Sequence, residues 1–170
     1  MNLSKIEPFQ NQLLQVIIET PKLSSYKYDY DIRLDIFCLD KLLPLGMNFP
    51  YDFGFIPGTK GQDGDPLDVL VIMEYPALQG ALVHCRIVGI LEANQTERNG
   101  KTVRNDRIIA VWALSSQYKD FLDVEDLSLQ TLHEVKNFFI QYNLLAGKKF
   151  ESLGWKNSEE ATKIIRSQIV

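Results

Sequence analysis

The spacing of apolar residues changes once along this chain, and that change constrains the fold more than any other feature. Strand-like patterns occupy residues 13–20, 26–36, 68–73, 81–92 and 107–112, where apolar residues alternate with polar ones or form short β-branched runs. After residue 126 the apolar residues recur at helical spacing, and two helices are expected, one before Gly147 and one opening at Asn157. Strands first and helices last predict an α+β fold with a mainly antiparallel sheet or small barrel.

The bulk properties indicate one soluble domain spanning residues 1–170. A net charge of −4 argues against a nucleic-acid partner. The first residues lack the apolar core of a secretory signal, and no apolar run approaches the ~18 residues of a membrane span. Cys38 and Cys85 lie far apart among apolar residues, so we expect buried free thiols. A cytoplasmic location and no membrane contact are therefore expected.

An acidic turn precedes one of the buried strands. Asp63, Asp65 and Asp68 fall within six residues, around a glycine and a proline, and Val-Leu-Val-Ile-Met follows at once. Carboxylates this close repel one another unless a proton or a cation neutralises them, and Mg²⁺ or Ca²⁺ prefers such oxygen ligands. An EF-hand is excluded, because Leu67 and Asp68 occupy positions that need a ligand and a glycine. A solvated turn is the alternative, but Asp68 opens directly into an apolar run.

Basic residues near turns and strand ends supply the opposite charge. They are Lys27, Lys41, Arg104, Arg107, Lys148 and Lys149. Each alone is typical of a solvated surface, but together with a cation-binding turn they favour a phosphate ligand, whose chemistry needs both kinds of positive charge. Lys27 and Asp29 share one parity of the alternating segment and can point into one cavity, although a solvated charged face is the simpler reading.

These motifs resemble family I soluble inorganic pyrophosphatases. The acidic turn through Val69 is similar to the family signature, and residues 49–57 precede it at the family's distance. Phe138, Phe139 and Tyr142 before Gly147 match a later motif, and the likeness spans roughly residues 13–167. It implies a small OB-like antiparallel β-barrel flanked by two main α-helices. It also implies Mg²⁺-dependent hydrolysis of pyrophosphate and a homo-oligomer, a hexamer in most bacterial members.

The resemblance assigns roles to individual residues. It implies that Asp63, Asp68 and Asp65 surround the metal ions, and that Asp65 is also the general base that deprotonates the attacking water. Glu19 and Asp29 match supporting acidic positions. The positions that bind substrate phosphate are matched by Lys27, Lys41, Arg107 and Tyr142.

Several positions depart from the family pattern. Lys41 replaces an arginine and loses its bidentate fork, Phe49 and Phe53 replace tyrosines, and Asn143 replaces a lysine. Gln95 and Asn105 fall where acidic ligands are expected, and Arg107 stands at a lysine position.

We therefore expect weakened phosphate binding, and restoring Asp at positions 95 and 105 should raise activity unless Glu92, Glu97 or Asp106 serves instead. Two alternatives stay open. One is a catalytically impaired protein that binds metal and phosphate, and the other is a hydrolase of a different diphosphate.

Overall fold

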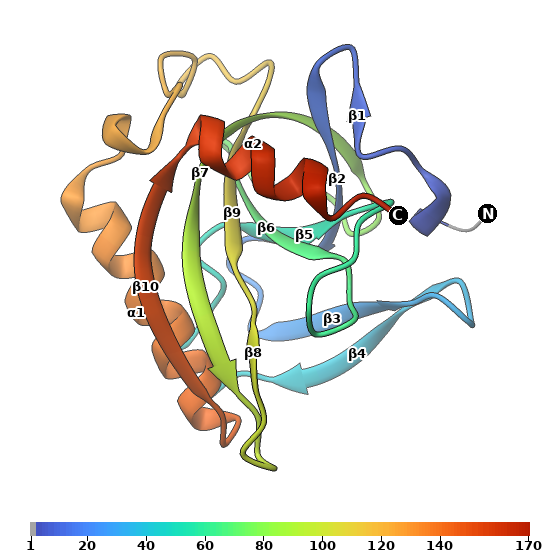
Figure 1. Cartoon of the computed structure of the whole chain (residues 1–170), viewed down its shortest axis with the longest axis vertical. Helices are drawn as coiled ribbons and strands as arrows, with labels where there is room; N and C mark the ends of the chain where they lie inside the picture. Colours follow the sequence, from blue (N-terminus) through green and yellow to red (C-terminus); the bar gives the residue numbers. More distant parts are fainter. Residues whose placement is uncertain (1–2) are drawn as a thin grey trace.

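The computed structural model describes residues 3–170 (Figure 1). The strands are β1 (Phe9–Gln10), β2 (Leu13–Thr20), β3 (Tyr26–Asp31), β4 (Ile36–Leu42), β5 (Asp52–Ile56), β6 (Leu67–Ile72), β7 (Leu82–Thr96), β8 (Thr102–Arg104), β9 (Arg107–Trp112) and β10 (Lys149–Asn157). The helices are α1 (Leu129–Leu145) and α2 (Ser158–Ser167), with short 3-10 turns η1 (Leu3–Lys5) and η2 (Val124–Asp126). Within the described residues, no helix is long and apolar enough to cross a membrane.

Five strands form a closed ring. The pairings run β2-β5-β6-β9-β7, and β7 returns to pair with β2. This ring with two helices confirms the expected α+β, OB-like architecture. The sheet is mainly antiparallel, as expected, and one pairing, that of β6 with β9, is parallel. The reason is topological: the chain passes through β7 first, and β9 then turns back antiparallel to β7 and lies beside β6.

The two helices cover opposite faces of the ring strands. Successive residues of a strand point to opposite faces, so β6 contributes to two apolar clusters. Val69 packs in the cluster that contains Ile165 of α2, and Leu70 packs in the cluster that contains Phe139 of α1. Figure 1 shows α2 lying across one end of the strands, while α1 runs alongside β10.

Strand β5 approaches β2 so closely that one position must be glycine. A Cβ added at Gly54 would lie 2.0 Å from the backbone oxygen of Ile17. The two strands pair antiparallel at this point, with Gly54 opposite Ile18. A side chain here would push β5 away from β2 and open the ring.

The alternating segment 26–36 forms the start of a hairpin, as its period predicts. Strands β3 and β4 make a separate two-stranded sheet in which Asp29 lies opposite Cys38. Both cysteines are free, as expected. Cys85 is fully buried, and burial raises the pKa of its thiol. The expectation of burial was wrong for Cys38, which is only half-buried because the hairpin stands apart from the ring.

Candidate active site

One cavity of about 390 Å³ collects most of the residues selected from the sequence. Its lining includes Lys27 and Asp29 of β3, Lys41 of β4, Asp63, Asp65 and Asp68 of the acidic turn and β6, Arg107 of β9, and Tyr142 of α1. Glu19 is the exception, since it lines an adjacent cavity of about 670 Å³. The two cavities share the side chains of Asp29, Asp40, Asp65 and Asp68. The acidic turn therefore stands between them.

The acidic turn is held by hydrogen bonds within its own loop. The backbone N–H of Asp65 donates to Asp63 Oδ1 at 3.2 Å, and the N–H of Gly61 donates to the carbonyl of Asp65 at 2.7 Å. Gly64 has a φ of +98°, which favours glycine at the tip. Burial raises the pKa of Asp65, and the neighbouring Asp63 and Asp29 carboxylates raise it further. A bound cation would reduce the repulsion between the carboxylates of this loop.

The donor set fits a hard divalent cation. Asp29, Asp63, Asp65 and Asp68 supply carboxylate oxygens to one cavity. Within residues 3–170, no three acidic, histidine or cysteine side chains converge on a single point. Mg²⁺ keeps several waters and needs only one or two protein carboxylates, so a full protein cage is not required. The turn is suited to a partly hydrated ion.

Lys27 is a buried ammonium group held by two carboxylates. Its Nζ lies 3.6 Å from Glu19 Oε2, contacts Asp29 Oδ1 and donates to the carbonyl of Tyr28 at 2.6 Å. Burial lowers the pKa of Lys27, but Glu19 and Asp29 outweigh it, so the pKa is raised overall. Burial raises the pKa of Glu19 to about 7, although Lys27 opposes this change. Asp29 and Lys27 do point into one cavity, as their shared parity predicts.

Lys41 and Tyr142 form a cation–π contact at the cavity wall. Lys41 Nζ lies 5.2 Å from the centre of the Tyr142 ring and 3.0 Å from Asp40 Oδ2. Burial raises the pKa of the Tyr142 hydroxyl, so it stays protonated and can donate a hydrogen bond. The position matched to an arginine thus keeps its positive charge beside a phenolic donor.

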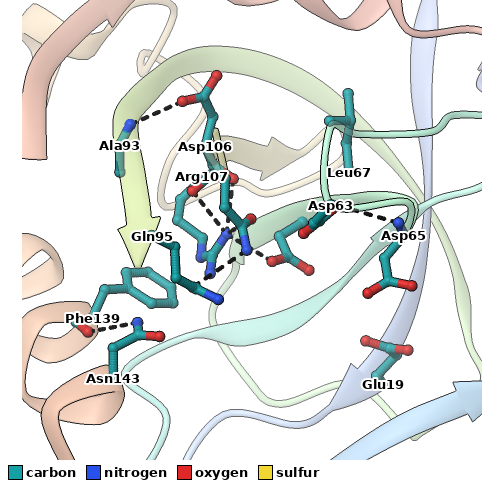
Figure 2. Close-up of polar contacts among 12 residues, drawn as sticks. Glu19, Asp63, Asp65, Leu67, Ala93, Gln95, Asp106, Arg107, Phe139 and Asn143 are labelled. Atoms are coloured by element: carbon teal, nitrogen blue, oxygen red, sulfur yellow. Dashed lines mark hydrogen bonds and ion pairs between the residues drawn. The ribbon is translucent and has the colours of Figure 1, made fainter. Parts of the chain in front are cut away.

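Arg107 is the most firmly held cation of the site. Its side chain is only 4% exposed and its guanidinium lies 4.9 Å from the Phe139 ring and 5.6 Å from the Phe150 ring. Nη1 lies 2.8 Å from Asp68 Oδ2 and also donates to Asn105 Oδ1. Burial raises the pKa of Asp68, and the Arg107 charge opposes that rise. Figure 2 shows Arg107 between the Asp63 and Asp65 side chains and those of Gln95 and Asn143.

The two amides that replace expected acids are both hydrogen-bonded, and Gln95 is buried while Asn105 is half-buried. Gln95 Nε2 donates to Glu97 Oε1 at 2.6 Å, and Asn105 Nδ2 donates to Gln95 Oε1 at 3.3 Å. Glu97 Oε2 in turn lies 2.8 Å from Lys148 Nζ. Glu97, one of the three acids expected from the sequence as possible substitutes, lines the cavity, and it shares the strand parity of Gln95.

The other acids considered as substitutes lie elsewhere. Glu92 and Asp106 both pair with Arg104, and the three line a separate cavity of about 250 Å³. Asp106 Oδ1 also accepts from the backbone N–H of Ala93 at 2.9 Å. Neither carboxylate lines the cavity of about 390 Å³, whereas Glu97 does, although Asp63 and Asn105 line both cavities.

Phe49 and Phe53, which stand at the tyrosine positions, are buried in the wall of the cavity. Phe49 is 1% exposed and Phe53 is 4% exposed. Their rings pack 5.3 Å apart, and Phe49 also contacts Tyr142. Asn143 is buried as well and donates to the carbonyl of Phe139 at 2.9 Å. These side chains offer little ring face to a ligand.

Comparison with known proteins agrees with this geometry. Residues 16–170 match the family described as inorganic pyrophosphatase. An inorganic pyrophosphatase of Synechocystis is 37% identical over 167 residues, which cover 97% of this chain and 95% of that protein. The crystal structure of the Thermus thermophilus inorganic pyrophosphatase superposes with a TM-score of 0.91 at 33% identity, covering 99% of this chain and 97% of that one. The Helicobacter pylori enzyme superposes at 0.87 with 31% identity, covering 97% and 96%.

Fold, cavity and relatives define a phosphoanhydride hydrolase that depends on a divalent metal. The chain belongs to the inorganic pyrophosphatase family.

Proposed function

We propose that this protein hydrolyses inorganic pyrophosphate to two orthophosphates with Mg²⁺ as the divalent cation. The observation that carries the proposal is one cavity lined on one side by the Asp63, Asp65 and Asp68 carboxylates and on the others by lysine and arginine. Phosphoryl transfer is catalysed mainly by positioning and by neutralising charge, and this cavity offers both. A bound divalent cation would supply Lewis-acid stabilisation and a more acidic water.

Each side chain has a role that its surroundings support. Asp63 and Asp68 would hold the cation, with Asp65 beside them on the same turn. Asp65 would accept the proton of the attacking water, and its raised pKa brings it closer to the working pH of a general base.

The cationic and phenolic side chains would bind the phosphate oxygens. These are Lys27, Lys41, Arg107 and Tyr142. Glu19 and Asp29 would keep Lys27 charged and in place, since both lie against its ammonium group.

A phosphate-release assay on the purified protein tests the proposal. Pyrophosphate with Mg²⁺ should release orthophosphate, and EDTA should stop the release. A nucleoside diphosphate serves as the control substrate. Phe49 and Phe53 are buried and offer little ring face to a larger diphosphate, so the control should release little orthophosphate. Metal binding without turnover would instead identify an impaired pyrophosphatase-like binding protein.

We also propose that residues 1–170 act as one domain, in the cytoplasm, as a homo-oligomer. The family resemblance supports a hexamer. Large apolar side chains that are more than three-quarters exposed, such as Tyr75, Leu78 and Leu114, support burial against another copy. Light scattering coupled to size exclusion would measure the mass, and a monomer at working concentration would exclude the oligomer.

A further inference from the structure

A continuous series of polar contacts runs along the cavity wall and ends at Asp68 of the acidic turn. It joins six side chains, here called the relay, in the order Lys148, Glu97, Gln95, Asn105, Arg107 and Asp68. All six line the cavity. They come from β6, β7, β9, the loop after α1 and the loops that flank β8, so the relay ties together segments far apart in the sequence.

The relay requires amides at its two central positions. Gln95 donates to a carboxylate through Nε2 and accepts from Asn105 through Oε1. Asn105 donates to Gln95 and accepts from Arg107 through Oδ1. A carboxylate has no donor, so an acid at position 95 would face Glu97 Oε1 across the 2.6 Å contact with nothing to donate. Gln95 and Asn105 are therefore fitted to their neighbours as amides.

The relay fixes one edge of the Arg107 guanidinium and leaves another free. Its hydrogen bonds to the described residues all leave from Nη1, which meets Asp68, the Asn105 side chain and the carbonyls of Asn105 and Asp106. Nε is buried without an acceptor among these residues. The N–H groups of Nη2 therefore remain for an anion in the cavity. The Phe139 and Phe150 rings hold the guanidinium plane.

Both carboxylates of the relay are paired with a cation. Both oxygens of Glu97 are engaged, one by Lys148 and one by Gln95, and Asp68 Oδ2 is engaged by Arg107. Lys101 adds a further cation to the same cavity. At the Glu97 end of the relay, a divalent ion would have to displace one of these contacts to gain a charged ligand, whereas an anion would displace none.

We propose that the relay makes this wall a phosphate-binding surface that needs no divalent cation, with Gln95 and Asn105 acting as positioning residues for Arg107. Divalent ions are then confined to the acidic turn. The proposal rests on the proposed function, because it assigns one end of the substrate to the relay. It gives the two amides a role other than that of weakened metal ligands.

The first test uses methylenebisphosphonate, a diphosphate analogue that cannot be hydrolysed. Calorimetric titration of the whole protein in EDTA should show saturable binding. The Gln95→Glu variant should bind it roughly tenfold or more weakly, because a contact to a charged group is lost and a repulsive one is gained. Absence of binding to the wild-type protein in EDTA, or unchanged affinity in Gln95→Glu, would overturn the proposal.

A double variant that keeps the net charge distinguishes the loss of hydrogen bonds in the relay from simple charge repulsion. In the double variant Gln95→Glu with Glu97→Gln, the amide at position 97 can donate to the carboxylate at position 95, which still accepts from Asn105. The net charge equals that of the wild type. We expect bisphosphonate affinity to return toward the wild-type value. An exchange variant as weak as Gln95→Glu would show that the hydrogen-bond order does not matter and would refute the relay.

Counting bound Mn²⁺ tests whether divalent ions are confined to the acidic turn. Electron paramagnetic resonance of free Mn²⁺, with bisphosphonate present, should give the same number of bound ions for wild type and Glu97→Gln, and a lower number for Asp63→Asn. Loss of an ion in Glu97→Gln would place a cation at the wall and contradict the proposal. Metal-free binding without pyrophosphate turnover would refute only the proposed function, and turnover without metal-free binding would refute only this inference.

Discussion

At the scale of single residues, Asp68 lies between the other carboxylates of the acidic turn and a buried arginine. It lines the cavity with the other carboxylates of the acidic turn, and its Oδ2 lies 2.8 Å from the buried Arg107. A buried guanidinium that loses its carboxylate is destabilising, because its charge is left without compensation. Asp63 also lines the cavity, but within residues 3–170 it pairs with no buried cation, and it is exposed.

This difference predicts that the Asp68→Ala and Asp63→Ala variants differ in their free energy of unfolding. Asp68→Ala should lower both Mg²⁺ affinity and the free energy of unfolding, the latter by about 2 kcal/mol. Asp63→Ala should lower Mg²⁺ affinity and cost under about 1 kcal/mol of stability. Urea unfolding in EDTA and Mg²⁺ calorimetry measure the two effects. Equal stabilities of the two variants would show that the Asp68–Arg107 pair does not support the fold.

A second prediction concerns Asp65 as the general base. Asp65→Asn keeps a carbonyl oxygen for a metal but cannot accept a proton. Turnover should fall by about 10²–10⁴-fold, while Mg²⁺ binding measured by calorimetry changes little. Wild-type turnover in this variant would remove Asp65 from its assigned role.

Local pattern was sufficient to find part of this site. The acidic turn lies within six residues, and Lys27 and Asp29 share a parity, so neither needed knowledge of the fold. Gln95 and Asn105 were interpreted as weakened metal ligands because they stand at acidic positions of the family pattern. Their partners are only two to ten residues away, but the sequence does not show which side chains meet. The structure gives those amides hydrogen bonds that a carboxylate cannot make. We now expect Asp at positions 95 and 105 to lower activity, the reverse of the expectation from sequence.

At the scale of elements, the contact between β5 and β2 depends on a missing side chain. Gly54→Ala should destabilise the protein by about 3 kcal/mol or more, because the new Cβ would meet backbone that cannot rotate away. Gly46→Ala is the matched control. Gly46 has a φ of +86° and open space around it, so only backbone strain of about 1 kcal/mol is expected. Thermal unfolding compares the two variants, and a Gly54→Ala protein as stable as the control would contradict the close approach.

Regular patterns predicted both helices and half of the strands, whereas β1, β4, β5, β8 and β10 were not predicted. Strands β2 and β9 and helix α2 begin where the period and the cap signals place them. Strand β10 was missed because Lys149–Asn157 has no sustained alternation and carries a register shift between Ser152 and Gly154. It is a strand because its backbone pairs with β7, between Lys149↔Thr96 and Asn157↔Gly89, and no local pattern records pairing with a segment so far away. The same holds for the parallel pairing of β6 and β9.

At the scale of the whole molecule, the buried Glu19 makes stability depend on pH. Its pKa is about 7 in the folded protein and near its ordinary value of 4.5 when unfolded. The folded state therefore holds this proton more tightly, and the contribution of Glu19 to stability is lost as pH rises from 4.5 to 7. The shift corresponds to about 3 kcal/mol across that window.

The Glu19→Gln variant isolates this contribution. In EDTA, the free energy of unfolding of the wild type relative to Glu19→Gln should fall by about 3 kcal/mol between pH 4.5 and pH 7.5. Urea unfolding at several pH values measures the difference. A difference that stays constant with pH would mean that Lys27 keeps the pKa of Glu19 near its ordinary value.

The unequal settings of the two cysteines have a practical consequence. Cys85 is sealed inside the ring and its thiol resists ionisation, whereas Cys38 is half-buried on β4, opposite Asp29 and in the lining of the larger cavity. Thiolate is the reactive form, so a maleimide dye should attach to Cys38 alone. The native sequence thus carries a ready attachment point for a fluorophore beside the acidic turn, where emission would report the arrival of ions without any engineered substitution.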